Sequence, residues 1–318
     1  MRTRRYLLGR LAWSAFVAWL VFTLTFLVFV WMPDNNLNFL LWLRDPEVQQ
    51  RIMEQYRQQM NYHLPLHERY LHWLTAFATF DWGESLVQNR PVADIVGDAA
   101  PVTLGYLVPS ILLSFVVGGA LGLYSTVRRG PLEKLGRTVV YLGLALPAFW
   151  FGWMLLYLAR DRTGLELIWR ANQGVYSGDN LAVIALPIAV MTVNLTAAQA
   201  RYTRAETAEY VVADFTKTIR ASGGGAVDVA RHVLRNALVP LTSLFFTRTL
   251  TVLLLSVYVI EEVFQLPGLG RITLEAIRSS DVAVILAMTV ITVGFGVLGN
   301  LLQDVAYAFL DPRLEDHE

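Results

Sequence analysis

The residue with the greatest capacity for chemistry is a single arginine, Arg248, in an otherwise uncharged apolar run. An arginine within a bilayer costs at least ~2.5–3.5 kcal/mol, so its side chain must face protein or water. It would either line a solute pathway and meet a carboxylate, or bond to helix carbonyls or a neighbouring subunit. We prefer the second interpretation and keep Arg248 as a candidate pathway residue.

Two further polar groups lie at the ends of apolar runs. Glu261 and Glu262 follow one run and would bind a cation or a substrate amine, or fix the turn at 267–270. Asn300 and Asp304 are one helical turn apart and would form a polar site, or cap a helix and pair with a loop arginine. In both cases we prefer the structural role.

Metal binding and catalysis have little support. His63, His67 and His72 have spacings similar to those of metal ligands, but Pro65 interrupts the first pair and the chain has no cysteine. We therefore predict no metal site and no catalytic residue. There is also no G-x-x-x-x-G-K-[ST] phosphate loop, so we expect this chain to bind no cofactor and to leave ATP hydrolysis to another subunit.

Composition indicates which elements hold these residues. The 318 residues are 55% hydrophobic and 16% charged, whereas soluble domains are about 45–50% apolar and about 25% charged. Net charge is zero, which argues against nucleic acid as a partner. Six apolar runs are long enough to cross a bilayer as helices: Leu11–Met32, Thr103–Val127, Thr138–Ala159, Leu181–Ala200, Asn236–Ile260 and Val282–Gln303.

The first run is predicted to be a retained span. It would be about 33 Å long as a helix, and a signal peptide would have a shorter apolar region of roughly 7–15 residues. The short loops on one side of the six runs are rich in arginine and those on the other side are poor. This asymmetry places both termini in the cytoplasm. We predict an all-α, multi-pass protein of the cell membrane.

The chain is predicted to have three parts: 1–32, the N-terminal segment and first span; 33–102, an external cap loop; and 103–318, a five-helix core that contains a cytoplasmic loop, 201–240. In the cap, Pro46–Met60 is typical of a polar helix. Gly118 and Gly122 form a G-x-x-x-G pair, which permits close helix approach. We expect it to pack within the chain rather than at a dimer face.

The loop 201–240 has the sharpest pattern. It is amphipathic and basic, and two helical stretches flank a glycine cluster, Gly223–Gly225. Glycine ends helices and allows positive φ, so we expect a short helix between two turns. Such an element would dock into a groove on a cytosolic partner or lie on anionic lipid, and chemistry alone does not separate the two.

Several motifs in this part of the chain resemble one family. The loop carries Phe215, Thr218, Arg220, Ala221, Ser222, Gly223, Gly224, Gly225 and Asp228, followed by R-H-x-L-R-N-A-L-x-P from Arg231 and His232 to Pro240. Further on, E-x-V-F-x-x-P-G-L-G is matched by Glu261, Val263, Phe264, Pro267, Gly268, Leu269 and Gly270. The C-terminal N-L-L-x-D-x-x-Y-x-x-x-D-P-R is matched by Asn300, Asp304, Tyr307, Asp311, Pro312 and Arg313.

These motifs, in this order, resemble ABC importer permeases of the dipeptide/oligopeptide/nickel (DppB/OppB-like) family. The resemblance implies a type I permease fold with an external cap and a cytoplasmic coupling helix. It also implies a second homologous permease, two cytosolic ATPase subunits that bind ATP and magnesium, and an external solute-binding protein. The loop would be the ATPase-coupling element, and the later motifs would be structural.

Two other classes compete with this reading. A self-sufficient secondary transporter or channel commonly carries inverted repeats and charged midplane sites, whereas this sequence has one midplane charge and no repeat that we detect. A membrane enzyme would need a catalytic grouping, and no Ser/His or Asp/Asp arrangement recurs within the runs.

Overall fold

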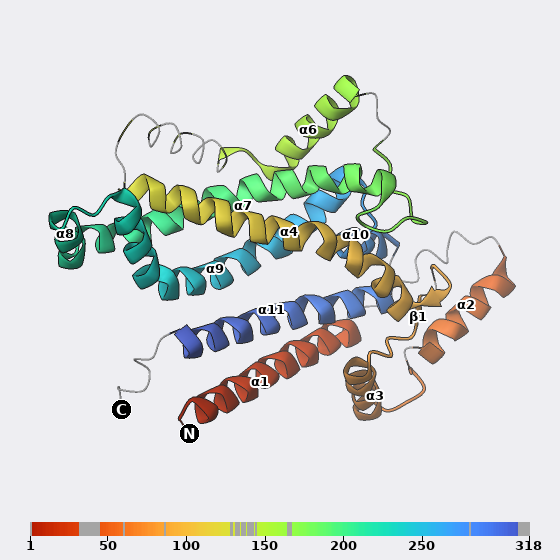
Figure 1. The fold of residues 1–318 in the computed structure, drawn as a ribbon. Helices are drawn as coiled ribbons and strands as arrows, with labels where there is room; N and C mark the ends of the chain where they lie inside the picture. The colour runs from red at the N-terminus through yellow and green to blue at the C-terminus, as the bar shows by residue number, and fades with distance from the viewer. Residues whose placement is uncertain are drawn as a thin grey trace. The chain divides into compact units, whose positions relative to one another are not determined.

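The computed structural model describes residues 2–31, 45–59, 61–85, 87–127, 130, 134, 138, 143, 145–163, 167–279 and 281–310. Most of this is helix (Figure 1). The helices are α1 (Arg2–Trp31), α2 (Pro46–Gln59), α3 (Leu66–Thr79), α4 (Val92–Val127), α6 (Ala148–Thr163), α7 (Gly178–Val212), α8 (Asp214–Ala221), α9 (Ala226–Phe264), α10 (Leu269–Ser279) and α11 (Val282–Leu310). A two-stranded antiparallel hairpin joins β1 (Glu84–Ser85) to β2 (Arg90–Pro91).

Among the described residues, four helical segments are long and apolar enough to cross a membrane: Leu8–Val28, Val92–Val127, Gly178–Val212 and Val282–Leu301. They correspond to the first, second, fourth and sixth predicted runs. The fifth run, Asn236–Ile260, lies inside α9. The third run is not one unbroken helix, because the backbone bends at Leu146 and Pro147 before α6 begins. Proline lacks an N–H and restricts the residue before it, which accounts for the break.

Two helix ends differ from the sequence prediction. Helix α4 begins at Val92, so the end of the predicted external loop, 92–102, is helical and continuous with the span. Pro101 lies inside α4 without ending it. Helix α7 continues to Val212, well past the predicted end at Ala200. The loop 201–240 is therefore mostly helical, and its only non-helical residues are Ala213 and the four from Ser222 to Gly225.

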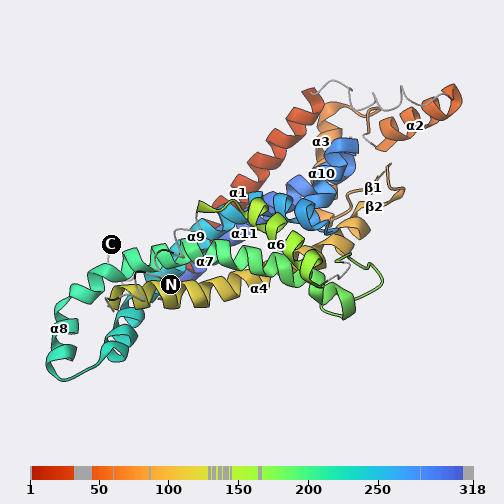
Figure 2. The ribbon, with the colours of Figure 1, turned by 90° about the horizontal axis from the view of Figure 1, so that it is seen from above.

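The chain divides into two compact units. The first contains residues 1–8, 103–266 and 299–318. Within it, α4 and α7 lie side by side in Figures 1 and 2. A Cβ atom on Gly118 would lie 3.0 Å from the Thr196 carbonyl oxygen, and one on Gly122 would lie 2.6 Å from that of Ala200. The predicted packing of the glycine pair within the chain is confirmed.

The order of the contacts between α4 and α7 gives the direction of one helix relative to the other. Ser110 donates to the Ile188 carbonyl at 3.3 Å, and the hydroxyls of Thr126 and Thr207 are 3.0 Å apart. Because later residues of α4 meet later residues of α7, the two helices run parallel.

The second unit contains residues 9–102 and 267–298. Its core joins the first turns of α4, one face of α10 and the first turns of α11, through Val92, Ile95, Ala99, Leu269, Ile272, Ala276, Val284, Ala287 and Met288. The buried carboxylate of Asp281 accepts a hydrogen bond from Ser85, which ties the hairpin to the start of α11. In this unit α1 also packs against α3 through aromatic side chains.

Candidate functional site

The short helix expected in the cytoplasmic loop is α8, Asp214–Ala221, which lies between α7 and α9 at one end of the first unit (Figure 2). It begins where Ala213 turns to an extended conformation, with ψ of 155°. The Thr216 side chain is fully buried and its hydroxyl donates to the Tyr210 carbonyl at 2.9 Å. This bond crosses the kink, so α8 is held at an angle fixed by α7.

The glycine cluster ends α8 with a set of backbone hydrogen bonds. The N–H of Gly223 donates to the Arg220 carbonyl at 3.1 Å, and that of Gly224 donates to the Ile219 carbonyl at 2.9 Å. Gly223 has φ of +84°, in the left-handed region. This pairing is the Schellman motif, which satisfies the last carbonyls of a helix and favours glycine at the left-handed position.

Gly224 is the more constrained of the two glycines. A Cβ on Gly224 would lie 2.8 Å from the Ile219 carbonyl oxygen, whereas a Cβ on Gly223 would meet nothing within 4 Å. Gly225 is extended, with φ of −83°, and precedes α9. Its N–H donates to the Asp228 carboxylate at 2.9 Å, and the His232 ring nitrogen Nδ1 is 2.9 Å from the Asp228 carbonyl oxygen.

The outer surface of this segment is exposed. Phe215 is half-buried, while Thr218, Arg220, Ala221, Ser222, Gly223, Arg231 and His232 are exposed or largely so. The valines on either side of α8 have exposed side chains: Val212 is 70% exposed and Val227 71%. We call residues 212–232 the coupling segment. It offers exposed apolar, basic and acidic side chains on a backbone held by the Thr216 bond and the Schellman turn.

At the opposite end of α9 lies a buried polar cluster. The Glu261 carboxylate is fully buried and accepts hydrogen bonds from Thr103 at 2.6 Å and Tyr106 at 3.0 Å. Both donors come from α4, and Tyr106 is itself fully buried. We call these three residues the Glu261 cluster. It joins α9 to α4 where α9 ends, and the Glu261 carbonyl also accepts the N–H of Leu266 at the following turn.

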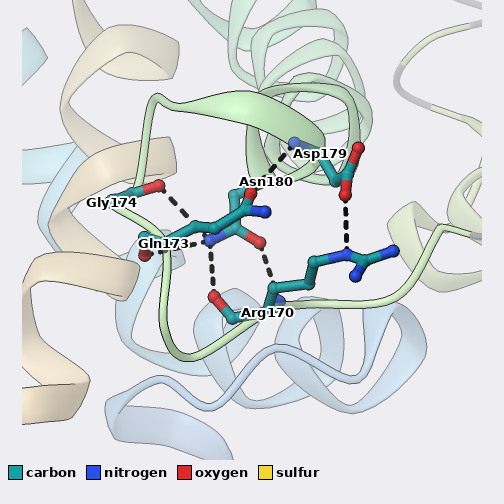
Figure 3. A network of polar contacts seen from close by, with 5 residues as sticks. All are labelled: Arg170, Gln173, Gly174, Asp179 and Asn180. Atoms are coloured by element: carbon teal, nitrogen blue, oxygen red, sulfur yellow. Dashed lines mark hydrogen bonds and ion pairs between the residues drawn. The ribbon is translucent and has the colours of Figure 1, made fainter.

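The start of α7 is organised by a third cluster, shown in Figure 3. Asn180 is fully buried, accepts the N–H of Arg170 at 2.8 Å, and donates to the carbonyls of Arg170, Gln173 and Gly174. Arg170 also pairs with Asp179 at 2.6 Å. Tyr176 donates to the Gly105 carbonyl at 2.6 Å, so this loop is folded on itself and held to α4.

The sequence was compared with known families and proteins. Residues 101–316 match the family described as "Binding-protein-dependent transport system inner membrane component". The chain belongs to this family. The match covers α4 beyond its first turns, the coupling segment, the Glu261 cluster and α11.

Relatives of this permease cover nearly its whole length. It is 31% identical over 304 residues to the "Oligopeptide transport system permease protein AppB" of Bacillus subtilis (strain 168), which covers 92% of this chain and 93% of that protein. It is 29% identical over 311 residues to the "Glutathione transport system permease protein GsiC" of Escherichia coli (strain K12), covering 97% and 98%. The resemblance to ABC importer permeases is confirmed. The permease is a multi-pass membrane protein and a transport component rather than an enzyme.

The remaining predicted residues of the permease are dispersed. Phe264 is buried at the end of α9, Pro267 and Gly268 form the turn before α10, and Gly270 is buried in α10. Asn300 is exposed on α11. The side chains of Arg248 and Asp304, and the whole of Asp311, Pro312 and Arg313, lie outside the residues that the structure describes.

The three histidines do not come together as one group. His63 lies in the turn before α3, whereas His67 and His72 lie on α3, and His67 is 3.8 Å from Glu68. Within the described ranges, no group of three His, Asp or Glu side chains could hold a metal ion.

Sequence reasoning missed the partners of Glu261 and the role of Asn180. We expected Glu261 and Glu262 to fix the turn at 267–270, and the bonds from the Glu261 carboxylate to Thr103 and Tyr106 of α4 were not part of that prediction. The available signal was the presence of Thr103, Tyr106 and Ser110 at helical spacing in an otherwise apolar run. Polar residues in such a run usually face protein, because lipid offers them no hydrogen-bond partner.

Proposed function

We propose that this chain forms half of the translocation pathway of an ATP-driven importer of short peptides, with six spans and both termini in the cytoplasm. The names of the two relatives support the solute class, since glutathione is itself a tripeptide. The parallel course of α4 and α7 supports the topology. Two spans that run in the same direction need a return crossing between them, and the run Thr138–Ala159 would supply it.

The coupling segment is proposed to dock on a cytosolic ATPase subunit. The observation that carries this role is the build of α8: eight residues, fixed at one end by Thr216 and at the other by the Schellman turn, with its outer face exposed. A short rigid helix suits insertion into a groove, where apolar anchors supply affinity. The ATPase would bind all of the ATP and magnesium, and this chain would bind no cofactor.

The other partners follow from the family. A second homologous permease would complete the pathway, and an external solute-binding protein would deliver the peptide to the face that carries the cap, 33–102. ATP binding would shift the population between an inward-facing and an outward-facing arrangement, with no covalent chemistry in this chain. Arg248 is proposed to bond to carbonyls or to a neighbouring subunit, so Arg248→Gln should leave uptake unchanged at normal expression.

Cysteine labelling tests the topology and the docking together, because the chain has no cysteine of its own. Ala221→Cys places a thiol on the exposed end of α8, and Asn172→Cys places one on the exposed loop before α7. A membrane-impermeant maleimide should label Ala221→Cys only in inverted vesicles and Asn172→Cys only in intact cells. Labelling of Ala221→Cys from outside the cell would rule out the proposed docking.

The solute class has its own test. The complete importer is reconstituted in proteoliposomes that enclose ATP, with the binding protein outside. Transporters whose ATPase subunits face the lumen should take up radiolabelled di- to oligopeptides or glutathione. Unlabelled peptides should compete, and equal concentrations of the constituent free amino acids should not. Competition by free amino acids alone would contradict the peptide assignment.

A further inference from the structure

Helix α3, in the segment predicted to be an external cap, packs against a membrane-crossing helix at membrane depth. The hydroxyls of Thr23 and Tyr70 are 2.8 Å apart. The rings of Phe26 and Tyr70 are 5.3 Å apart, and those of Phe22 and Trp73 are 6.1 Å apart. Among the described residues, the candidate span in α1 is Leu8–Val28. Phe22 lies six residues before Val28, ~9 Å along the helix at ~1.5 Å per residue, so the contact falls within that span.

The contacts also fix the course of α3. Phe22 and Phe26 are one turn apart on α1, and Tyr70 and Trp73 are about one turn apart on α3. These contacts join about one turn of each helix, and Figure 1 shows α3 across the end of α1 rather than along it. With α1 crossing the bilayer, α3 is inclined to the membrane normal.

The residue pattern of α3 has two apolar strips. At 3.6 residues per turn, Leu66, Tyr70 and Trp73 share the strip that meets α1. Leu71, Leu74 and Ala78 form a second strip beside it, with His67 at its start, paired to Glu68, and Leu71 is 56% exposed. The opposite side is polar and carries Glu68, His72, Thr75 and Thr79. Contact with α1 thus covers only part of the apolar surface.

The surroundings identify what covers the second strip. On the same half of α1, Leu24 is 53% exposed and Val28 59%, as expected for side chains that contact lipid. Tyrosine and tryptophan are enriched at the boundary between hydrocarbon and headgroups, which is the depth that Tyr70 and Trp73 occupy. We propose that α3 is an interfacial helix, with Leu71, Leu74 and Ala78 buried in lipid and its polar side facing the headgroups and water.

This inference goes beyond the proposed function and does not depend on the solute or the ATPase. It concerns one end of α1 whichever side of the membrane that end faces. A failure of the peptide or docking proposals would leave it unaffected. It revises the prediction for the cap. Helix α3, in a segment expected to be surrounded by water, would lie in the membrane interface and hold α1 in place.

The test uses spin labels in the complete transporter, reconstituted in nanodiscs of phosphatidylethanolamine and phosphatidylglycerol. Leu71→Cys labels the second apolar strip, and His72→Cys, about 100° further round the helix, labels the polar side. Val116→Cys on α4, 67% exposed within a candidate span, gives a lipid reference. Each variant is first required to show normal uptake. The label at position 71 should be relaxed more by oxygen than by a water-soluble nickel chelate, and the label at 72 should show the reverse.

Each other result would overturn the proposal. Equal access of the nickel chelate to positions 71 and 72 would mean that α3 stands in water. Shielding of position 71 from both reagents would mean that protein covers the strip. Loss of nickel access at 71 only after the solute-binding protein is added would assign the strip to that protein instead of to lipid.

Discussion

The two ends of α9 are built in opposite ways. At its start, the coupling segment holds its shape with the Schellman turn and the buried Thr216 hydroxyl, while most of its other side chains stay exposed. At its end, Glu261 holds α9 to α4 through buried side chains. A surface that must meet a partner can be rigid in its backbone and free in its side chains. A contact between two spans instead needs polar side chains that are buried and bonded to each other, because lipid cannot satisfy a polar group.

The largest expected effect comes from removing the Glu261 carboxylate at the buried end of α9. Glu261→Ala removes the carboxylate that accepts from Thr103 and Tyr106, and the loss of a buried hydrogen bond to a charged group costs roughly 1.5–3 kcal/mol. The apparent melting temperature of the purified importer should fall clearly, and uptake should fall with it. Glu262→Gln, at the half-buried neighbouring position, is the control. An equal fall in both variants would mean that the Glu261 cluster contributes nothing specific.

The next effect concerns the contact of α4 with α7. In Gly122→Ala the new methyl group would lie 2.6 Å from the Ala200 carbonyl oxygen, so the helices must separate. Overpacking of this kind typically costs ~1–3 kcal/mol. Gly119→Ala is a matched control three residues away, since its Cβ would meet nothing within 4 Å. Thermal melting of both variants measures the difference, and equal stability would show that the helices tolerate a wider separation.

At the coupling segment we expect a loss of coupling with little loss of stability. Gly223→Ala would place alanine at a left-handed φ, which costs roughly 1–2 kcal/mol. Gly224→Ala would meet a different obstacle, because its Cβ would lie 2.8 Å from the Ile219 carbonyl oxygen and force that carbonyl to move. Gly225→Ser should be tolerated, because serine is favoured before a helix.

The readout is uptake per ATP hydrolysed in proteoliposomes. It should fall in the order Gly225→Ser, Gly223→Ala, Gly224→Ala, from no change to the largest loss, while the melting temperature of the complex stays nearly constant. A parallel fall in melting temperature would mean that the turn serves folding instead of coupling.

The contrast between the two ends also explains what could be predicted from the sequence. Helix α8 is predictable because local signals define it: a glycine cluster, charged residues and helical spacing, all within residues 214–225. The partners of Glu261 were not, because Thr103 is 158 residues away in the sequence and a single sequence carries no information on such a pairing.

The sequence did not predict where α4 begins, for a different reason. The predicted external loop ends at 102 because the uncharged apolar run begins at Thr103. In the structure Asp94 lies in the first turn of α4, where an acidic residue favours helix formation. The interior of α4 then tolerates Pro101. Charge and proline mark the end of an apolar run, but they do not mark the end of a helix that continues beyond it.

The smallest expected effect tests whether the coupling segment works by shape or by charge. Lys217 and Asp214 form an ion pair of 2.7 Å within α8, with side chains 71% and 96% exposed. Water and salt screen such a pair, so Lys217→Gln should not measurably change stability. Uptake per ATP should also stay the same, because the Schellman turn and the Thr216 bond hold α8 without it. If Lys217→Gln uncouples transport while Gly224→Ala does not, then docking depends on charge at the α8 surface and the rigid backbone is incidental.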